Sequence, residues 1–368
     1  MSLATPEKTK EYALKFDKFS EDFFNIKENL YFSSLGVGTY VPEPYKEENY
    51  TFSFKNSIKE AILNGSNVID CASNFRYGQS EREVGEAIRE LESENQIDRE
   101  SLILSTKVGF VQLDFPFPKN PYHWIEDNII KPKRATKEQV FIDQYCLEPE
   151  YLKWSFERSL KNMGVDGIDI LYLHNPEFAL GHITYQELLE KIEQSFILFE
   201  ELKKEGKINF YGVASWNSFL FENDNLEYIS IKDLVNIARK IDAKGFKFIQ
   251  MPYNLAKTHA FNYTNQPADD ELFYSPLQIA KKYNLNIVGS SSLLQMNLFK
   301  KPFSQTVTKL LGKVFVSDIQ KALQFARSAP DITTALFSSK EPTHIKHNLE
   351  LAHIPKTPSQ NYMKIFNL

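Results

Sequence analysis

The sequence predicts an α/β protein that folds as a (β/α)8 TIM barrel, and two observations carry this prediction. Short apolar runs alternate with amphipathic segments along most of the 368 residues, and eight such runs are present. Eight strand-then-helix units are typical of a closed parallel barrel. An open doubly wound sheet is the competing architecture, but it favours the turn G-x-G-x-x-G. Here Gly36-Val37-Gly38 lacks the third glycine, and the next residues, Thr39 to Pro42, cannot begin a helix cleanly.

Turn residues or helix caps bound each apolar run and so set the predicted elements. The predicted strands span residues 32–38, 67–70, 102–107, 168–174, 210–215, 246–251, 287–291 and 333–337. The predicted helices span residues 52–63, 80–91, 150–163, 185–205, 231–243, 276–283, 317–328 and 344–352. Pro149 precedes the helix that opens at Glu150, and proline suits the first turn of a helix.

Three regions lie outside the repeat. Residues 1–30 form a charged N-terminal extension that we expect to be partly helical over 11–24, and residues 354–368 form a C-terminal tail. The barrel then spans 31–353, with residues 110–149 as a long loop inserted after the third strand. A loop of that length is usually functional or mobile. Its position favours a lid over the pocket, and an ordered surface appendage is the alternative.

The composition excludes several classes of protein. The net charge of −5 argues against a general nucleic-acid binder, which is usually basic. Two cysteines, Cys71 and Cys146, cannot form a disulfide framework and fit a reducing compartment. The charged N-terminus does not resemble a signal peptide, and no apolar stretch is long enough to span a membrane. We therefore expect a cytoplasmic protein.

Three chemically active side chains end separate predicted strands. Asp70 ends the second, Lys107 the third and His174 the fourth. Any one of them alone is more often a turn former or a hydrogen-bonded, half-buried side chain. In a barrel, however, the carboxyl ends of all the strands meet at one rim, where the active site lies. The three together therefore predict a catalytic site.

Several stretches of this chain resemble the aldo-keto reductase superfamily. They are Leu35 to Thr39, Val68 to Asp70 with Gly78 to Glu81, Leu104 to Gly109, Ser159-Leu160 with Gly164 to Asp169, Leu171 to Glu177, Gly206 to Ile208 with Tyr211 to Val213, Gln250 to Leu255, and His344 to Leu349. The resemblance covers roughly residues 31–353 and is greatest for long bacterial-type members with an extended third loop.

This resemblance implies the chemistry of the site. Members bind NADPH and reduce a carbonyl group, usually with an Asp, a Tyr, a Lys and a His. Asp70, Lys107 and His174 match three of these. A free phenol has a pKa of ~10, and a neighbouring ammonium lowers that value, so Lys107 would prepare the tyrosine as an acid. Asp70 would hold Lys107, and His174 would orient the carbonyl oxygen.

The position of the tyrosine is open in the sequence. The family's tyrosine follows the Asp by five residues, where this chain has Phe75, and a phenyl ring cannot donate a proton. Tyr77, directly before Gly78, is the nearby acid that we name as catalytic. Either the loop is longer and Tyr77 takes the catalytic place, or Phe75 occupies it and the site is weakened. The string Asn74-Phe75-Arg76 favours the second interpretation.

The resemblance also implies a set of cofactor contacts. They are Gly36, Thr39, Asn175, Ser215, Asn217, Gln250, Ser290, Ser339, Lys340, His344 and Asn348. Ser290 stands where an aromatic ring often stacks on the nicotinamide, and His344 where an Arg is common. NADP is the expected cofactor, with NAD possible. His344 and His347 lie on one helix face without a third ligand nearby, so we predict no metal site.

The predicted function is therefore an NADP-dependent oxidoreductase acting on a small aldehyde or ketone. The alternative is a cofactor-binding barrel with weak or no catalysis that acts as a sensor or binds a partner protein. Phe75 and Ser290 favour this alternative, whereas the retained Asp70, Lys107 and His174 oppose it.

Overall fold

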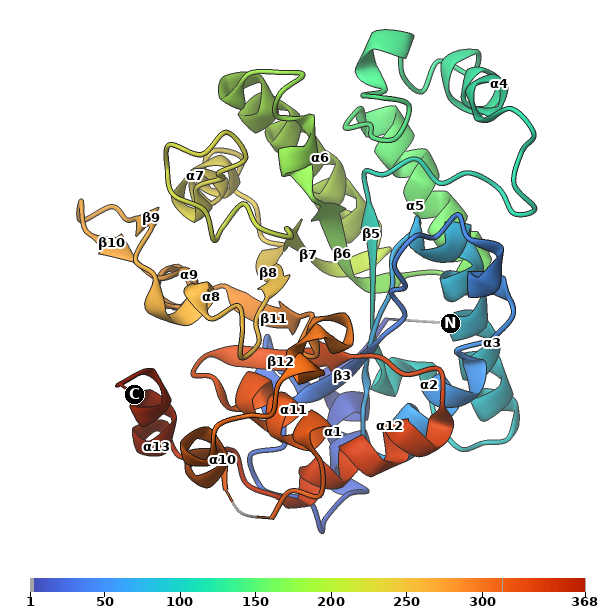
Figure 1. Cartoon of the computed structure of the whole chain (residues 1–368). Coiled ribbons are helices and arrows are strands. Elements are labelled where there is room, and N and C mark those ends of the chain that lie inside the picture. The colour runs from blue at the N-terminus through green and yellow to red at the C-terminus, as the bar shows by residue number, and fades with distance from the viewer. Residues whose placement is uncertain (1–2, 313, 368) are drawn as a thin grey trace.

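A computed structural model describes residues 3–312 and 314–367, in which eight parallel strands close into a barrel (Figure 1). The strands around it are β3 (Leu35–Gly38), β4 (Val68–Asp70), β5 (Ile103–Val108), β6 (Ile168–His174), β7 (Ile208–Ala214), β8 (Phe246–Pro252), β11 (Asn286–Ser290) and β12 (Ile332–Phe337). Each strand pairs with the next one in the chain, and β12 returns to pair with β3. The predicted fold class is confirmed.

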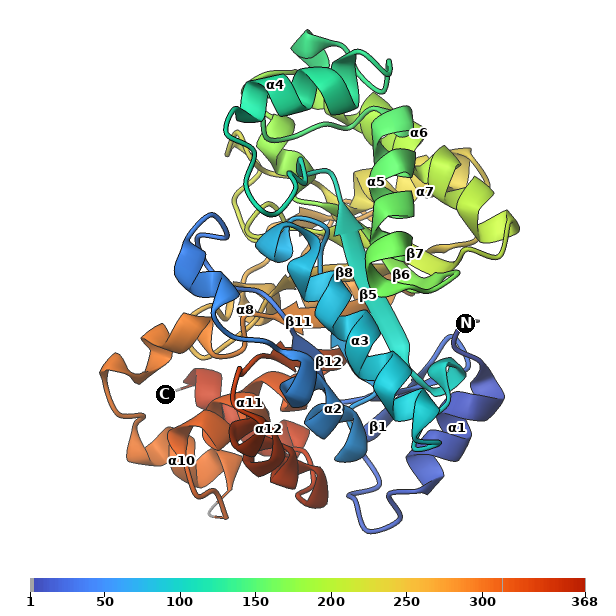
Figure 2. The same ribbon diagram turned by 90° about the vertical axis from the view of Figure 1, so that its right-hand side faces the viewer.

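A helix follows each barrel strand directly or after a loop, and these helices pack outside the barrel (Figure 2). They are α2 (Lys55–Leu63), α3 (Gln79–Ser93), α5 (Pro149–Met163), α6 (Tyr185–Lys204), α7 (Ile231–Lys240), α9 (Pro276–Lys282), α11 (Asp318–Ser328) and α12 (Pro342–Leu349). Local chemistry sets their ends: α6 starts at a Thr184–Glu187 capping box, and α5 stops at Gly164, which is left-handed.

The N-terminal residues differ from the expected helix over 11–24. Helix α1 (Pro6–Leu14) is shorter and begins earlier, because Thr5 caps it. A hairpin of β1 (Phe24–Lys27) and β2 (Leu30–Ser33) follows. Glu28 and Asn29 form its two-residue turn with φ values of 48° and 65°, the geometry that tight hairpins favour. The predicted first strand over 32–38 is therefore divided between this hairpin and β3.

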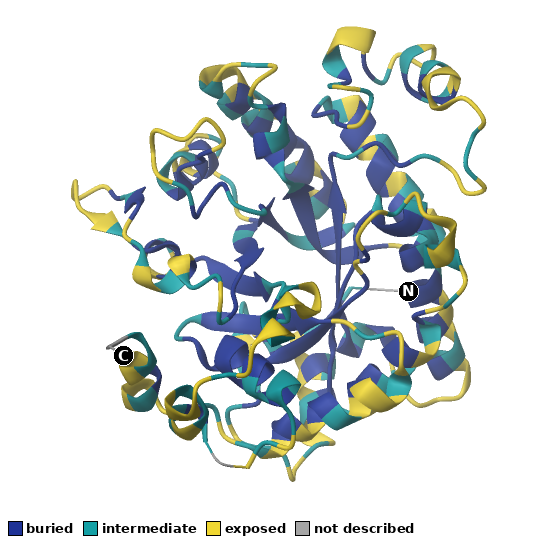
Figure 3. Cartoon of the chain, viewed as in Figure 1, coloured by how far each residue is buried: buried dark blue, intermediate teal, exposed yellow. Residues whose placement is uncertain are grey.

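Packed side chains fill the interior of the barrel below its rim. Leu30 and Phe32 of the hairpin, together with Ile170, Tyr172 and Phe248, belong to one buried cluster. The strands are almost wholly buried, and exposed residues gather on the outer helices and loops (Figure 3). Since these described side chains fill the lower barrel, a ligand is expected at the carboxyl ends of the strands.

The insertion at 110–149 contains α4 (Pro121–Ile125) and a π-helical turn (Glu126–Ile130), and it lies near α5 in both views of the chain (Figures 1 and 2). Arg158 of α5 anchors it through a 2.6 Å ion pair with Asp114 and a contact 5.4 Å from the Trp124 ring. Phe115 stacks on Tyr50 with ring centroids 4.0 Å apart. The insertion is thus an ordered appendage beside the rim.

The remaining elements are short. They are α8 (His259–Asn262), β9 (Gln266–Pro267), β10 (Phe273–Tyr274), α10 (Gln305–Leu311) and α13 (Ser359–Lys364). Among the described helices, none combines the length and the apolar character that crossing a bilayer requires.

Candidate active site

A cavity of about 560 Å³ opens at the carboxyl ends of the strands. Seven of the predicted site residues line it, from β4, β5, β6, β8 and β11 and the residues that follow β6 and β7: Asp70, Lys107, His174, Asn175, Ser215, Gln250 and Ser290. The structure thus brings the predicted acid, ammonium and imidazole to one cavity, as expected from their places at strand ends.

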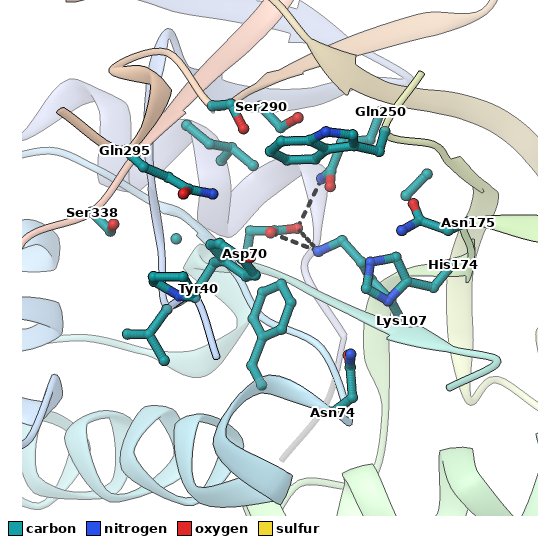
Figure 4. Close-up of a pocket in the computed structure, with 18 of the residues that line it drawn as sticks. Tyr40, Asp70, Asn74, Lys107, His174, Asn175, Gln250, Ser290, Gln295 and Ser338 are labelled. Carbon is teal, nitrogen blue, oxygen red and sulfur yellow. Dashed lines mark hydrogen bonds and ion pairs between the residues drawn. The ribbon is translucent and has the colours of Figure 1, made fainter. Parts of the chain in front are cut away.

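Asp70 and Lys107 form a buried ion pair at the base of this cavity (Figure 4). The Lys107 Nζ lies 2.7 Å and 2.6 Å from the two carboxylate oxygens and 2.8 Å from the backbone oxygen of Cys71. An ammonium has three N–H donors, so all of them are occupied. Ser105 and Gln250 also donate to Asp70 Oδ1, at 2.7 Å and 2.9 Å. The Lys107 ammonium is therefore fixed in place, and none of its N–H groups is free to donate to a ligand.

Phe75, and not Tyr77, faces this ion pair. The Phe75 ring lines the cavity, and its centroid lies 5.2 Å from Lys107 Nζ and 6.0 Å from the His174 ring. Tyr77 is absent from the described lining and packs on Phe117 of the insertion, with centroids 5.3 Å apart. Burial, with a smaller contribution from Tyr45, raises the pKa of Tyr77. The structure therefore does not support Tyr77 as the proton donor.

Arg76, between the two rings, explains this orientation. Its guanidinium forms a buried 2.7 Å ion pair with Glu83 and donates to the backbone oxygens of Asn49 and Phe52, at 2.7 Å and 2.8 Å. Arg76 and Tyr77 both have left-handed backbone angles, with φ values of 50° and 46°. Since the arginine is held on the outer side of the turn, its neighbours are turned so that Phe75 faces inward and Tyr77 outward.

His174 presents a neutral imidazole to the cavity. Burial lowers its pKa well below the usual value, and the nearby Lys107 charge adds to this effect. Its Nδ1 is buried without a hydrogen-bond partner, while Tyr145 donates to its backbone oxygen at 2.8 Å. A neutral histidine in this place can donate a hydrogen bond to a carbonyl oxygen but carries no charge of its own.

Three predicted cofactor contacts have other roles in the structure. Gly36 is buried in β3, where an added Cβ would lie 2.8 Å from Leu336 Cδ2, so a larger residue would have to displace this leucine. Thr39 is buried and donates to the backbone oxygen of Asp70 at 3.3 Å. Asn217 accepts a 2.9 Å hydrogen bond from Lys257. None of the three is among the described residues that line the cavity.

Four predicted cofactor contacts, Ser339, Lys340, His344 and Asn348, lie beyond the cavity, before and within α12. Lys340 and His344 are exposed, Ser339 is half-buried and Asn348 is buried. The Lys340 ammonium lies 5.3 Å from the Phe52 ring, and Ser339 Oγ accepts the Glu341 N–H at 3.1 Å. Ser338, the residue before them, does line the cavity, so this group continues the rim outward.

Two loops contribute lining residues that the sequence did not indicate. One follows β3 and supplies Tyr40, Val41 and Pro42, and the other follows β11 and supplies Leu293, Gln295 and Met296. Tyr40 and Gln295 lie opposite His174 and Asn175 (Figure 4). Of the insertion, only Phe110 is among the described lining residues, so the expected lid is not found. The one available signal was Tyr40, an aromatic residue directly after a strand end.

Comparison of this sequence with models of protein families agrees with the geometry of the site. The model of the aldo/keto reductase family matches residues 34–365. The chain belongs to this family. The predicted resemblance is therefore confirmed.

Individual relatives are distant. Glycerol 2-dehydrogenase (NADP(+)) of Hypocrea jecorina is 28% identical over 50% of this chain and 49% of that enzyme. A putative voltage-gated potassium channel subunit beta of Schizosaccharomyces pombe is 24% identical over 87% of this chain and 83% of the length of that protein. An aldo/keto reductase of Klebsiella pneumoniae, solved in complex with NADP and acetate, superposes with a TM-score of 0.60 at 16% identity and covers 95% of both chains.

Proposed function

We propose that this protein binds NADP(H), with NAD(H) as the weaker candidate, and reduces small aldehydes or ketones slowly. The observation that carries the proposal is the Phe75 ring 5.2 Å from Lys107, where an acid would be needed. The retained Asp70–Lys107 pair and the neutral His174 support an oxidoreductase. The missing hydroxyl supports a low rate.

The cavity has room and polar groups for the nicotinamide end of a dinucleotide. Its volume of about 560 Å³ falls within the usual range of small-molecule sites, ~300–1,000 Å³. Asn175, Ser215 and Gln250 line its wall and carry the hydroxyl and amide groups that suit a carboxamide. Lys340 and His344 lie at the start of α12, where a helix N-terminus and a cation favour a phosphate. The likeness to proteins whose names include NADP agrees with this assignment.

Each side chain then has a defined task. The cofactor supplies the hydride when it is bound. Lys107, fixed by Asp70, provides positive potential below the substrate, and His174 donates a hydrogen bond to the carbonyl oxygen. Phe75 cannot protonate that oxygen. The Tyr40 ring packs against Phe75, with ring centroids 5.1 Å apart, and burial raises the pKa of its phenol. We infer that the proton comes from water, so that general acid catalysis worth about 10²–10⁴-fold is lost.

Titration of the protein with NADPH, followed by its fluorescence, tests the binding. Oxidation of NADPH with a panel of small aldehydes then tests the turnover. We expect saturable binding and a kcat far below the usual range of about 1–10³ s⁻¹. A kcat within that range would overturn the proposed impairment, and its loss in Tyr40→Phe would identify Tyr40 as the acid. Absence of NADPH binding would overturn the whole proposal.

A second function, binding to a partner protein, is favoured by one comparison. The relative from Schizosaccharomyces pombe, named as a channel subunit, aligns with 87% of this chain. If assembly is the function, the oligomeric state or a partner's affinity should change between the NADPH-loaded and NADP⁺-loaded protein. Size-exclusion chromatography with each cofactor form tests the first of these. Identical elution alongside measurable aldehyde reduction would favour the enzyme.

A further inference from the structure

Glu177 lies behind the cavity wall and holds two of its lining residues. It belongs to the short 3-10 helix Pro176–Ala179 that follows β6. Its Oε1 accepts the Ser215 hydroxyl at 2.7 Å and the backbone N–H of Trp216 at 3.1 Å. Ser215 and Trp216 both line the cavity, whereas Glu177 is not among the described lining residues. The Glu177 carboxylate thus contacts the cavity only through the two lining residues that it holds by hydrogen bonds.

The Ser215 hydroxyl has no donor left for a ligand in this arrangement. Its oxygen accepts the Ser218 N–H at 2.9 Å and the Ser218 hydroxyl at 2.5 Å, and its own proton goes to Glu177. A hydroxyl has one donor and two acceptor positions, so all three are used. Ser215 can therefore donate to a carboxamide oxygen only by releasing Glu177.

Glu177 is poorly satisfied as a carboxylate. The residue is 7% exposed, and its Oε2 is buried without a hydrogen-bond partner. Burial raises its pKa to about 7 against the opposing effect of the hydrogen bonds from Ser215, its own N–H and Trp216. Two titratable groups face it. Glu227, on the loop after β7, raises this pKa further, and Tyr145 of the insertion has a pKa raised by its own burial and then by Glu177.

We propose that Glu177 is a positioning residue that couples binding of the nicotinamide carboxamide to uptake of up to one proton. Ser215 turns its hydroxyl from Glu177 Oε1 to the carboxamide oxygen, and the carboxylate takes a proton from solvent to become a carboxylic acid. This inference rests on the proposed binding of NADP(H).

The sign of the pH dependence follows from the lost hydrogen bond. Ser215 stabilises the charged form of Glu177, so releasing it raises the pKa of this carboxyl in the complex. NADPH then binds more tightly as the pH falls through the neutral range. A shift of one pKa unit corresponds to a tenfold change in affinity, so we expect roughly threefold to tenfold tighter binding at about pH 6 than at about pH 8.

Isothermal titration calorimetry with NADPH, in two buffers of different ionisation enthalpy, measures affinity and proton uptake together. The matched control ligand is 2′-phospho-ADP-ribose, which carries the same phosphates but no nicotinamide. Any titration of the phosphate or of His344 appears with both ligands, whereas the Glu177 effect appears with NADPH alone. We expect the difference between the ligands to vanish in Glu177→Gln and in Ser215→Ala and to persist in Glu227→Gln.

Two results would overturn the inference while the proposed function stands: NADPH binding without excess proton uptake over the control ligand, or the same excess in the folded Glu177→Gln protein. If Glu177→Gln does not fold, Ser215→Ala and the wild-type proton count decide the question. Failure of NADPH to bind at any pH would instead refute the proposed function.

Discussion

Replacing Phe75 with tyrosine is the sharpest test of why this site should be slow. The substitution places a phenol on a ring that already faces the Lys107 ammonium, in a cavity that has room for a ligand. A positioned general acid is worth about 10²–10⁴-fold. The three N–H donors of Lys107 are taken by Asp70 and the Cys71 carbonyl, so the ammonium acts on the new phenol through its charge alone. We therefore expect a gain near the lower limit, about 10²-fold in kcat/KM, or ~2.7 kcal/mol.

The assay compares NADPH oxidation by the wild type and Phe75→Tyr over a range of pH. The variant should gain activity and acquire a pH dependence in which rate falls as the new phenol loses its proton. Phe75→Leu controls for loss of the aromatic ring, and Tyr77→Phe removes the phenol that faces outward. We expect Tyr77→Phe to leave the slow wild-type rate unchanged. A Phe75→Tyr protein that folds, binds NADPH and is no faster than wild type would refute the reasoning.

Three further predictions concern stability and are measured by urea unfolding. Lys107→Met leaves Asp70 charged and buried, so we expect a loss of roughly 3–5 kcal/mol, partly recovered by adding Asp70→Asn; equal stability of the single and double variants would contradict this. Arg76→Leu removes the ion-pair partner of the buried Glu83 carboxylate, which keeps hydrogen bonds from Phe54 N–H and Gln79, and should cost roughly 3 kcal/mol; a loss below ~1 kcal/mol would exclude this prediction. The Glu177 carboxyl has a pKa of about 7 in the folded protein and 4.5 as a free side chain. Between pH 4.5 and pH 7, the folded state therefore binds a proton that the unfolded chain has lost. Wild-type stability relative to Glu177→Gln should therefore fall as the pH rises from about 4.5 to about 7, by on the order of 3 kcal/mol, and a flat difference would refute this pKa.

Much of the candidate site could be predicted from the sequence, because the ends of strands are marked by local sequence features. Asp70, Lys107 and His174 each close an apolar run, and a closed parallel barrel brings all such ends to one rim. Gln250 and Ser290 were predicted through the family resemblance, and both line the cavity. Gly36 instead lies within β3 against packed neighbours, and Thr39, directly after this strand, donates its hydroxyl to the backbone oxygen of Asp70. Spacing alone cannot distinguish a lining residue from a packed one.

The positions of the loops were predicted less accurately from the sequence, because contacts between distant residues determine where the loops lie. The aromatic insertion was expected over the cavity, yet Arg158 of α5 and Tyr50 of the loop after β3 hold it to one side. Lining by Tyr40 and Met296 depends on left-handed and irregular turns that no periodic pattern marks. The Glu177–Ser215 network is likewise invisible in the sequence, since its members are 38 residues apart.

The chain by itself determined the barrel, the order of its strands and the acid, ammonium and imidazole at its rim, because alternation of apolar and amphipathic segments is a local property. It left open which of two rings, at 75 or 77, faces the ammonium. Tertiary structure decided that point, because the arginine between them is held by Glu83 and by backbone carbonyls 24 and 27 residues away in the chain. A contact over that separation fixes the orientation of the turn, and no pattern within the turn encodes it.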